Sequence, residues 1–414
     1  MRAVVTGGGG YVGHRLGVAL AAAGHDVLLL DLAAPTVPLA PRLRFACVDV
    51  RDEEALAAAF TSADVVFHLA SFGMSGSQQL LPDVIEAVNV GGTRAVLQAS
   101  LAASVPSLVY LSTYNVVYGG QRIENGDESL PYFPLHRHPD AYSRTKAVVE
   151  QLVLAANMTP LPGRPGRYLR TCALRPAGIY GPGEQRHLPR IVRYLEMGLF
   201  SFVIGPPHEG IVDWLHVDNL VQAMLLAAEA LTAGRAHVAA GQAYFIHDDH
   251  PGVTSRVNNF EFLRPLVEGL GYAFPRIVLP AGLMYRLAFL LECLHRALLP
   301  AYDLSRLFIL TRAEVLKSSG THWFSIAKAR RELGYAPVRH DFWLVVQWFL
   351  DRGHGRRLQS RKQRTSGVST KHRRTCAPAA ATALAALGVA VAVLLMQLCM
   401  AVLLGRLLGW AAGM

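Results

Sequence analysis

The chain has 414 residues, of which 52% are hydrophobic, and its mean hydropathy of +0.27 is high for a plain soluble protein. This length suffices for one large domain or two ordinary domains. The net charge of +10 is concentrated at one end, because ten of the 40 basic residues follow Asp351 and the other 30 match the 30 acidic residues. The neutral body of the chain argues against a nucleic-acid-binding surface.

The cysteines predict neither a disulfide framework nor a zinc site. There are five, without a CxxC spacing: Cys47, Cys172, Cys293, Cys376 and Cys399. An odd, scattered set of this kind fits a reducing compartment. The histidines at 216, 247 and 250 also lack a metal-ligand spacing, so we expect no metal. The opening residues MRAVVTGGGG contain no charged-then-apolar leader, so we expect no cleaved signal peptide.

The first 180 residues alternate between short apolar runs and helical patterns. The apolar runs predict six strands, at 2–7, 26–32, 43–50, 63–70, 107–113 and 171–176. Helical patterns follow the first run and recur at 82–103 and around 141–150. Continuously apolar strands separated by helices are typical of a parallel sheet covered on both faces. Right-handed crossovers then predict a doubly wound α/β fold of the Rossmann type.

The turn after the first predicted strand is rich in glycine. It reads TGGGGYVG at 6–13 and places Gly7, Gly10 and Gly13 three residues apart. Glycines allow a tight turn and close approach of the backbone to a pyrophosphate, and the helix N-terminus that follows offers amide hydrogens to phosphate. Because the motif lies between a strand and a helix, and Asp31 ends the next strand, it predicts dinucleotide binding.

The residues around Asp31 favour NAD over NADP. The carboxylate would accept hydrogen bonds from the ribose hydroxyls of adenosine, and its charge would repel a 2′-phosphate. The following residues, Leu32, Ala33 and Ala34, offer no arginine to pair with that phosphate. We therefore expect NAD as the cofactor.

A tyrosine and a lysine share one face of the helix predicted around 141–150, which reads AYSRTKAVVE. Tyr142 and Lys146 stand at i and i+4, so their side chains are neighbours. A free tyrosine has a pKa of about 10, and lowering it by about three units takes on the order of 4 kcal/mol. A nearby lysine and a positively charged nicotinamide would favour the phenolate. The spacing suits a proton-transferring pair, although YxxxK also arises by chance.

The later part of the chain contains two long apolar segments before the basic region. The segment 214–230 predicts a strand followed by a helix, and 279–300 predicts a strongly apolar helix interrupted by Arg286, Glu292, His295 and Arg296. These charges make the second helix a poor membrane span. Two interpretations stay open for it: a helix packed on the core, or a lid that touches a bilayer and admits a lipid.

The C-terminal region predicts a membrane anchor. Residues 377–405 contain no charged residue, and this uncharged run is long enough to cross a bilayer core of roughly 30 Å. The basic linker 351–376 precedes it, and basic flanks stay on the cytoplasmic side. We expect a single-pass anchor with the preceding residues in the cytoplasm and the endoplasmic reticulum as the host membrane.

Eight motifs occur in a fixed order along the chain: TGxxGxxG at 6–13, Asp31, DVRD at 49–52, HLAS at 68–71, NVGGT at 89–93, LSTYNVVYGG at 111–120, YSRTK at 142–146 and LRPAGIYGPG at 174–183. With these motifs the chain resembles the extended short-chain dehydrogenase/reductases, and within them the 3β-hydroxysteroid dehydrogenase/isomerase group. The similarity spans nearly all of residues 1–350. It implies one catalytic domain over 1–350, in which 1–180 mostly bind the dinucleotide and 181–350 mostly bind substrate.

The resemblance also implies residue roles. Tyr142 would be the general acid/base and Lys146 its partner on the cofactor ribose. A hydroxyl from the STY segment would hold the substrate oxygen; we assign it to Thr113 and then to Ser112, because Tyr114 stands where the family usually has a further Ser or Thr. For Asn89, Leu69 and Ala70, ordinary packing is the alternative to a cofactor or proton-relay role. The implied cofactor-binding residues are Gly7, Gly10, Tyr11, Val12, Gly13, Asp31, Asp49, Val50, Leu69, Ala70, Asn89, Lys146 and Pro176.

These expectations combine into one functional hypothesis with two alternatives. The chain is expected to be a membrane-anchored, NAD-dependent dehydrogenase of the 3β-hydroxyl of a steroid or sterol-like lipid, with a coupled isomerisation and a homodimer as possibilities that the resemblance raises. The first alternative is an epimerase or reductase of another hydrophobic or sugar substrate; the residues IVDW at 211–214, where many relatives have an arginine, weaken its nucleotide-sugar form. The second is a catalytically quiet, NAD-binding membrane sensor or scaffold.

Overall fold

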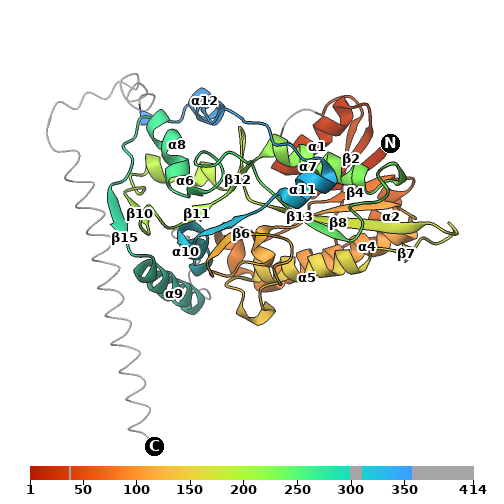
Figure 1. The fold of residues 1–414 in the computed structure, drawn as a ribbon, viewed down its shortest axis with the longest axis horizontal. Helices are drawn as coiled ribbons and strands as arrows, with labels where there is room; N and C mark the ends of the chain where they lie inside the picture. Colours follow the sequence, from red (N-terminus) through yellow and green to blue (C-terminus); the bar gives the residue numbers. More distant parts are fainter. Residues whose placement is uncertain (37–38, 299–309, 357–414) are drawn as a thin grey trace, which may run out of the picture.

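The computed structural model describes residues 1–36, 39–298 and 310–356. Its centre is a sheet in the order β13-β8-β5-β4-β1-β2-β3, all of whose neighbours are parallel (Figure 1). The strands are β1 Arg2–Thr6, β2 Asp26–Asp31, β3 Leu43–Cys47, β4 Val65–His68, β5 Ser107–Leu111, β8 Tyr168–Pro176 and β13 Gln242–Ile246, with the short β7 Thr159–Pro160 antiparallel to β8. The predicted doubly wound parallel sheet is confirmed.

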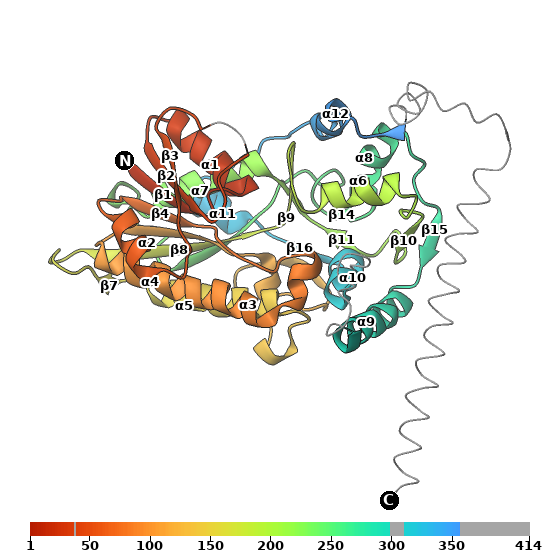
Figure 2. The same cartoon turned by 180° about the vertical axis from the view of Figure 1, so that it is seen from behind.

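Helices cover both faces of this sheet, as Figures 1 and 2 show. Alternate strand residues point to opposite faces, so Val5 and Leu29 pack with one helical layer while Val4 and Leu30 pack with the other. The first layer contains α1 Tyr11–Ala22, α7 Val217–Ala230 and α11 Ala327–Leu333; the second contains α2 Glu53–Phe60, α4 Gly92–Ala102 and α5 Ala141–Ala155.

The helix predicted at 82–103 is interrupted. It consists of α3 Pro82–Glu86, the π-helical turn η2 Ala87–Gly91 and α4. Glycine is required where α4 begins, because a Cβ on Gly92 would lie 2.8 Å from Val50 Cγ2. The wider turn carries Asn89, and π-helical turns are frequent at functional sites.

The second half of the chain builds smaller sheets at the carboxyl end of the main one. The strand order of the largest is β14-β11-β16-β6, beside the pairs β12-β9 and β10-β15. These strands are β6 Ile123–Gly126, β9 Gly178–Tyr180, β10 Phe202–Ile204, β11 Ile211–Val212, β12 Trp214–His216, β14 Val257–Asn258, β15 Ile277–Leu279 and β16 His322–Phe324. The helices around them are α6 Leu188–Glu196, α8 Arg264–Gly269, α9 Ala281–Leu298, α10 Arg312–Ser319 and α12 Trp343–Asp351. Single 3₁₀ turns connect elements throughout: η1 Gly76–Leu80, η3 Tyr114–Val116, η4 Leu135–Arg137, η5 Ala233–Arg235 and η6 Glu261–Leu263.

The two halves exchange elements. β6 lies before residue 180 but pairs with β16, while β13, α7 and α11 lie after residue 181 and complete the main sheet. The helix expected at 279–300 forms as α9, preceded by β15. Within the described ranges, none of the helices combines the length and the apolar character that crossing a bilayer requires. The predicted anchor at 377–405, and the basic linker from residue 357 onward, lie outside the described residues.

Candidate active site

The glycine turn lies where β1 meets α1, and its geometry requires glycine. Gly7 has a φ of +72°, and a Cβ on Gly13 would lie 2.2 Å from the carbonyl oxygen of Gly7. Gly10 is the N-cap of α1 and gives no side-chain bond to the helix. The first amides of α1 are therefore available for an anionic group, as the dinucleotide motif requires.

Asp31 is fixed beside this turn. Its Oδ2 accepts a hydrogen bond from the amide of Gly9 at 3.1 Å, and its Oδ1 accepts one from the amide of Leu32 at 2.7 Å. The carboxylate thus stands at the end of β2 next to the phosphate-binding backbone. This is the position from which a carboxylate can reach an adenosine ribose.

Tyr11 and Val12 begin α1. The hydroxyl of Tyr11 donates to the carbonyl of Pro182 at 3.3 Å, which joins the glycine turn to the loop after β9. Burial raises the pKa of Tyr11 above its usual range. Val12 packs against the core under α1. Both residues therefore support the turn, and their predicted contact with cofactor stays a prediction.

The next predicted cofactor residues line the adjacent strand ends. Asp49 pairs with Arg51 at 2.6 Å, and hydrogen bonds from the Arg51 side chain lower the pKa of Asp49. Val50 is buried against Gly92. After β4, Leu69 and Ala70 pass the glycine turn so closely that a Cβ on Gly7 would lie 2.8 Å from the Ala70 nitrogen. Pro176 is buried at the end of β8, opposite Ile246 of β13.

Tyr142 and Lys146 lie on the buried face of α5, exposed by 5% and 2%. Lys146 Nζ donates to the carbonyl of Leu111 at 2.5 Å and stands 4.2 Å from the centre of the Tyr110 ring. Burial lowers the pKa of Lys146 to about 7, against an opposing effect of Glu150. This side chain can therefore change its charge near neutral pH.

The pKa of Tyr142 moves in the direction opposite to the one expected from its lysine neighbour. The pKa is raised to about 12, because burial and the charge of Asp140 raise it by more than Arg186 and the Ser71 hydroxyl lower it. Desolvation thus outweighs the charges around the phenol. Without a cofactor, the phenol of Tyr142 is protonated at neutral pH.

The STY segment distributes its hydroxyls unevenly. Ser112 donates a short hydrogen bond to Glu150, so its hydroxyl is already engaged in the core. Thr113 is the N-cap of η3, where its Oγ1 accepts from the amide of Asn115 at 3.3 Å. Tyr114 packs with its ring centre 4.8 Å from that of His322. Thr113 remains the better predicted partner of a substrate oxygen.

Asn89 joins the loop after β4 to the helix α5. Its Oδ1 accepts from the amide of Phe72 at 2.8 Å, and its Nδ2 donates to the carbonyl of Phe72 at 3.1 Å and to Thr145 Oγ1 at 2.9 Å. Thr145 in turn donates to the carbonyl of Tyr142 at 2.9 Å. The side chain of Asn89 is engaged in these contacts, and its predicted relay role stays a prediction.

Sequence reasoning missed a buried ion pair next to Lys146. Glu150 is fully buried and accepts from Arg175 Nη2 at 2.6 Å, Arg175 Nε at 3.0 Å and the Tyr132 hydroxyl at 2.9 Å. The available signal was its spacing, since Glu150 stands four residues after Lys146 on the same helix face. The partner in β8 could not be read from that spacing.

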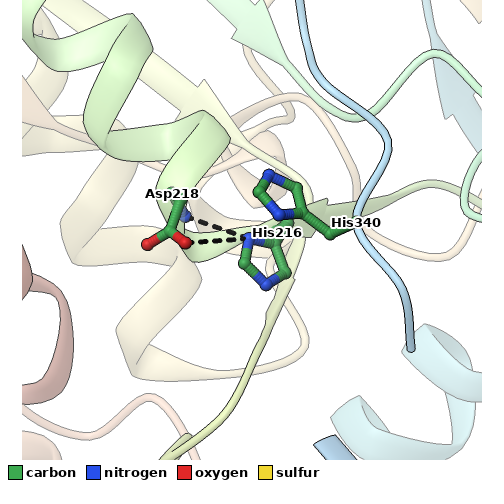
Figure 3. A group of neighbouring side chains, drawn as sticks. All are labelled: His216, Asp218 and His340. Carbon is green, nitrogen blue, oxygen red and sulfur yellow. Dashed lines mark hydrogen bonds and ion pairs between the residues drawn. The ribbon is translucent and has the colours of Figure 1, made fainter. Parts of the chain in front are cut away.

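Two histidines and an aspartate come close together in the second half: His216, Asp218 and His340 (Figure 3). The two imidazole rings are stacked, with centres 3.6 Å apart and planes at 13°. Stacked rings direct their nitrogen lone pairs along parallel planes, whereas a zinc ion needs them to converge at about 2.0–2.1 Å. His216 Nδ1 instead accepts from the amide of Asp218 at 3.2 Å and caps α7. Asp218 pairs with Arg15.

Comparisons with known proteins agree with this architecture. Residues 4–281 match the model of the 3-beta hydroxysteroid dehydrogenase/isomerase family. The Bos taurus protein named short-chain dehydrogenase/reductase family 42E member 1 is 56% identical, covering 86% of this chain and 88% of its own. A 3-beta-hydroxysteroid dehydrogenase of Mycolicibacterium neoaurum is 34% identical, covering 81% and 87%.

A solved structure shares the fold. The dTDP-glucose 4,6-dehydratase DesIV of Streptomyces venezuelae, solved with NAD and TYD bound, matches with a TM-score of 0.62 and 25% identity over 85% of this chain and 97% of that one. The glycine turn, the Tyr–Lys pair and the family match point to the same conclusion as the motifs. The chain belongs to the 3-beta hydroxysteroid dehydrogenase/isomerase family.

Proposed function

We propose that the protein is a membrane-anchored dehydrogenase that oxidises the 3β-hydroxyl of a steroid or sterol-like lipid. The observation that carries the proposal is the pair Tyr142 and Lys146, buried one helical turn apart on α5 within a member of this family of NAD(P)-dependent oxidoreductases. NAD is the cofactor, which agrees with Asp31 beside the glycine turn and with the NAD bound in the related dehydratase.

The residues present fit this cofactor. The amides at the start of α1 would hold the pyrophosphate, Asp31 the adenosine ribose, and Lys146 the ribose next to the nicotinamide. When bound, NAD accepts a hydride from the carbon that carries the hydroxyl. With such a cofactor bound, its positive charge would favour the phenolate form of Tyr142.

Tyr142 would take the hydroxyl proton of the substrate. Its pKa of about 12 in the cofactor-free protein is too high for a base at neutral pH, so the step depends on added positive charge nearby. Lys146, with a pKa of about 7, supplies such a charge only when it is protonated. Thr113 would orient the substrate oxygen. General acid–base catalysis of this kind contributes about 100- to 10,000-fold.

Exposed apolar side chains near β10, β15 and α9 support a substrate that arrives from a bilayer. Six of them are each between 46% and 57% exposed: Met197, Leu199, Ile277, Val278, Leu283 and Phe289. The strands β10 and β15 pair in parallel, which brings these segments together, and β15 and α9 lie at the end of the molecule opposite α1 (Figures 1 and 2). Exposed apolar patches of this kind are typical of membrane or protein contact.

The α9–α10 region also contacts the catalytic helix. Lys317 Nζ of α10 donates to Asp140 Oδ2 at 2.9 Å, and Asp140 caps α5 two residues before Tyr142. A substrate that enters beside α9 would therefore pass α10, which contacts the start of α5 close to Tyr142. The contact is made by α10, to which α9 is joined by the ion pair of Glu292 with Arg312, and in this indirect way it supports the lid interpretation of α9.

The anchor is part of the proposal. Residues 377–405 would span the membrane of the endoplasmic reticulum and keep the catalytic domain in the cytoplasm, in line with the uncharged run and the basic segment before it. Carbonate extraction tests this directly. Release of the full-length chain into the soluble fraction would contradict it, and a protease added to sealed microsomes should digest residues 1–350.

The main alternative is a catalytically quiet, NAD-binding membrane sensor. One observation favours it. Ser112 is hydrogen-bonded to Glu150, and Tyr114 stands where the family usually has a further Ser or Thr. Of the two predicted substrate-holding hydroxyls, only that of Thr113 at the start of η3 does not donate to a buried carboxylate. Tight NAD binding without turnover of any lipid alcohol would support this alternative.

The test is turnover by the full chain in lipid nanodiscs. NAD and a panel of 3β-hydroxysteroids are supplied, and NADH absorbance is followed for the wild type and Tyr142→Phe. Tyr335→Phe is the matched control, because Tyr335 is 1% exposed and donates to the His247 carbonyl at 3.2 Å, outside the site. NADH formation lost only in Tyr142→Phe supports the proposal; equal rates in both variants would contradict it.

A further inference from the structure

A buried histidine joins the cofactor strand to the helix layer that carries the catalytic pair. His68 ends β4, is 1% exposed, and lies between two threonines. Thr6 Oγ1 of β1 is 2.7 Å from its Nδ1, and Thr93 Oγ1 of α4 is 2.8 Å from its Nε2. Thr6 and Thr93 are exposed by 0% and 1%, so water cannot replace either contact.

The hydrogen-bond directions in this network assign one tautomer to His68. Thr93 gives its own proton to the carbonyl of Asn89 at 2.6 Å, so its oxygen is an acceptor toward the ring. His68 Nε2 therefore carries the proton, and Nδ1 accepts from Thr6. Burial, with a smaller effect from Lys146, lowers the pKa of His68 to about 3, in agreement with a neutral ring.

The network continues to the catalytic tyrosine. Thr93 holds the carbonyl of Asn89 in the π-helical turn, where a regular helical bond is displaced. The Asn89 side chain binds Thr145, and Thr145 binds the carbonyl of Tyr142. A continuous series of short polar contacts thus runs from β1 beside the glycine turn to α5.

We propose that His68 is a positioning residue for the reaction: as a neutral Nε2–H imidazole, it fixes Asn89, and through it Tyr142, relative to the cofactor strand. The effect on turnover rests on the proposed function, whereas the effect on the geometry of α5 does not. An apolar residue at this position would leave the buried hydroxyls of Thr6 and Thr93 with one partner fewer each.

Two substitutions separate the two sides of the ring. The amide of His68→Gln reaches the place of Nε2 and can donate to Thr93, whereas the shorter His68→Asn serves only the Thr6 side. We expect His68→Gln to retain most of the kcat. His68→Asn should lower kcat by about 10- to 100-fold, the cost of a small misplacement of reacting groups, with unchanged NAD affinity. Equal losses in both variants, or no loss in His68→Asn, would overturn the proposal.

A second pair of variants avoids changing the histidine. Thr93→Val removes a buried hydroxyl of α4 that donates to the i−4 carbonyl of Asn89 in η2. Ser100→Ala removes a hydroxyl of α4 that also donates to its i−4 carbonyl, that of Val96 at 2.7 Å, outside the network. Hydrogen–deuterium exchange with NADH bound should speed up in the peptides covering 87–93 and 141–150 for Thr93→Val alone.

The turnover and exchange measurements distinguish a failure of the proposed function from a failure of the proposed role of His68. If the wild type oxidises no 3β-hydroxysteroid, the proposed function fails, and the exchange comparison still decides the role of His68. If Ser100→Ala loosens residues 141–150 as much as Thr93→Val does, or neither variant affects them, the positioning role of His68 is refuted.

Discussion

Lys146 and Glu150 lie one turn apart on the buried face of α5, and their charges are held by different partners. Lys146 donates to a backbone carbonyl, that of Leu111, whereas Glu150 pairs with the guanidinium of Arg175. The anion next to Lys146 is thus already neutralised by a third residue. This explains why Glu150 offsets only part of the desolvation of Lys146, whose pKa stays near 7.

Breaking the buried pair should destabilise the protein strongly. Glu150→Gln leaves the charge of Arg175 buried without a counter-ion, and removing one partner of a buried pair typically costs about 3–5 kcal/mol. Among the described residues, Nη1 of Arg175 already has no hydrogen-bond partner. Urea unfolding measures the change. Glu54→Gln, at an exposed position on α2, is the control; similar midpoints for both variants would contradict the prediction.

The stability of the cofactor-free protein should rise with pH in the alkaline range through Lys146. Its folded pKa of about 7 lies below the ordinary lysine pKa of 10.5, so between these values the unfolded chain binds the additional proton. The free energy of unfolding then increases with pH by up to about 1.4 kcal/mol per unit. Urea unfolding at pH 7, 8.5 and 10 measures the slope.

Lys146→Met is the comparison for this slope, because it removes the titrating amine and keeps an unbranched side chain of similar length. The wild type should gain stability relative to this variant as the pH rises from about 7 toward 10.5. A difference between the two proteins that stays constant over this range would show that Lys146 does not titrate there.

Asp31 should determine the preference for NAD. Asp31→Asn removes the charge that is expected to bind the ribose hydroxyls and to repel a 2′-phosphate, so NADH affinity should fall by about 10-fold and the discrimination against NADPH should shrink. Fluorescence titration with both reduced cofactors measures the two constants. Asp26→Asn on the same strand is the control, because Asp26 pairs with the exposed Arg42.

Gly13 should tolerate no side chain. In Gly13→Ala the new Cβ would lie 2.2 Å from the Gly7 carbonyl oxygen, so the turn must open and NADH binding should be lost. Gly282→Ala is the matched variant in α9, where a Cβ meets nothing within 4 Å. It should leave NADH binding intact and stabilise the helix by roughly 0.5–1 kcal/mol. Retained NADH affinity in Gly13→Ala would contradict this account of the turn.

Local patterns predicted the parts of the site that a short segment encodes. The glycine turn, the carboxylate at the end of β2 and the Tyr142–Lys146 spacing each depend on residues within one strand–turn–helix unit. Their placement in the structure follows from that local geometry. The protonation of Tyr142 was not accessible in this way, because it depends on burial by segments that are distant in the sequence.

The contacts missed by the sequence reasoning join distant segments. Glu150 meets Arg175 of β8, and His68 joins residues 6 and 93. No periodicity links such positions. The break between α3 and α4 was likewise hidden, because the two glycines of NVGGT are tolerated in a helix and only the approach of Val50 shows why one is required.

The late position of β13 has a consequence for synthesis on the ribosome. β8 is flanked by β5 and by β13, and β13 is not translated until residue 246. Until then the growing chain presents an open sheet edge, and the part of the apolar face that α11 covers stays uncovered until residue 333. Unpaired edges are prone to association between chains. The nascent protein should therefore depend on chaperones over the interval in which residues 177–246 emerge.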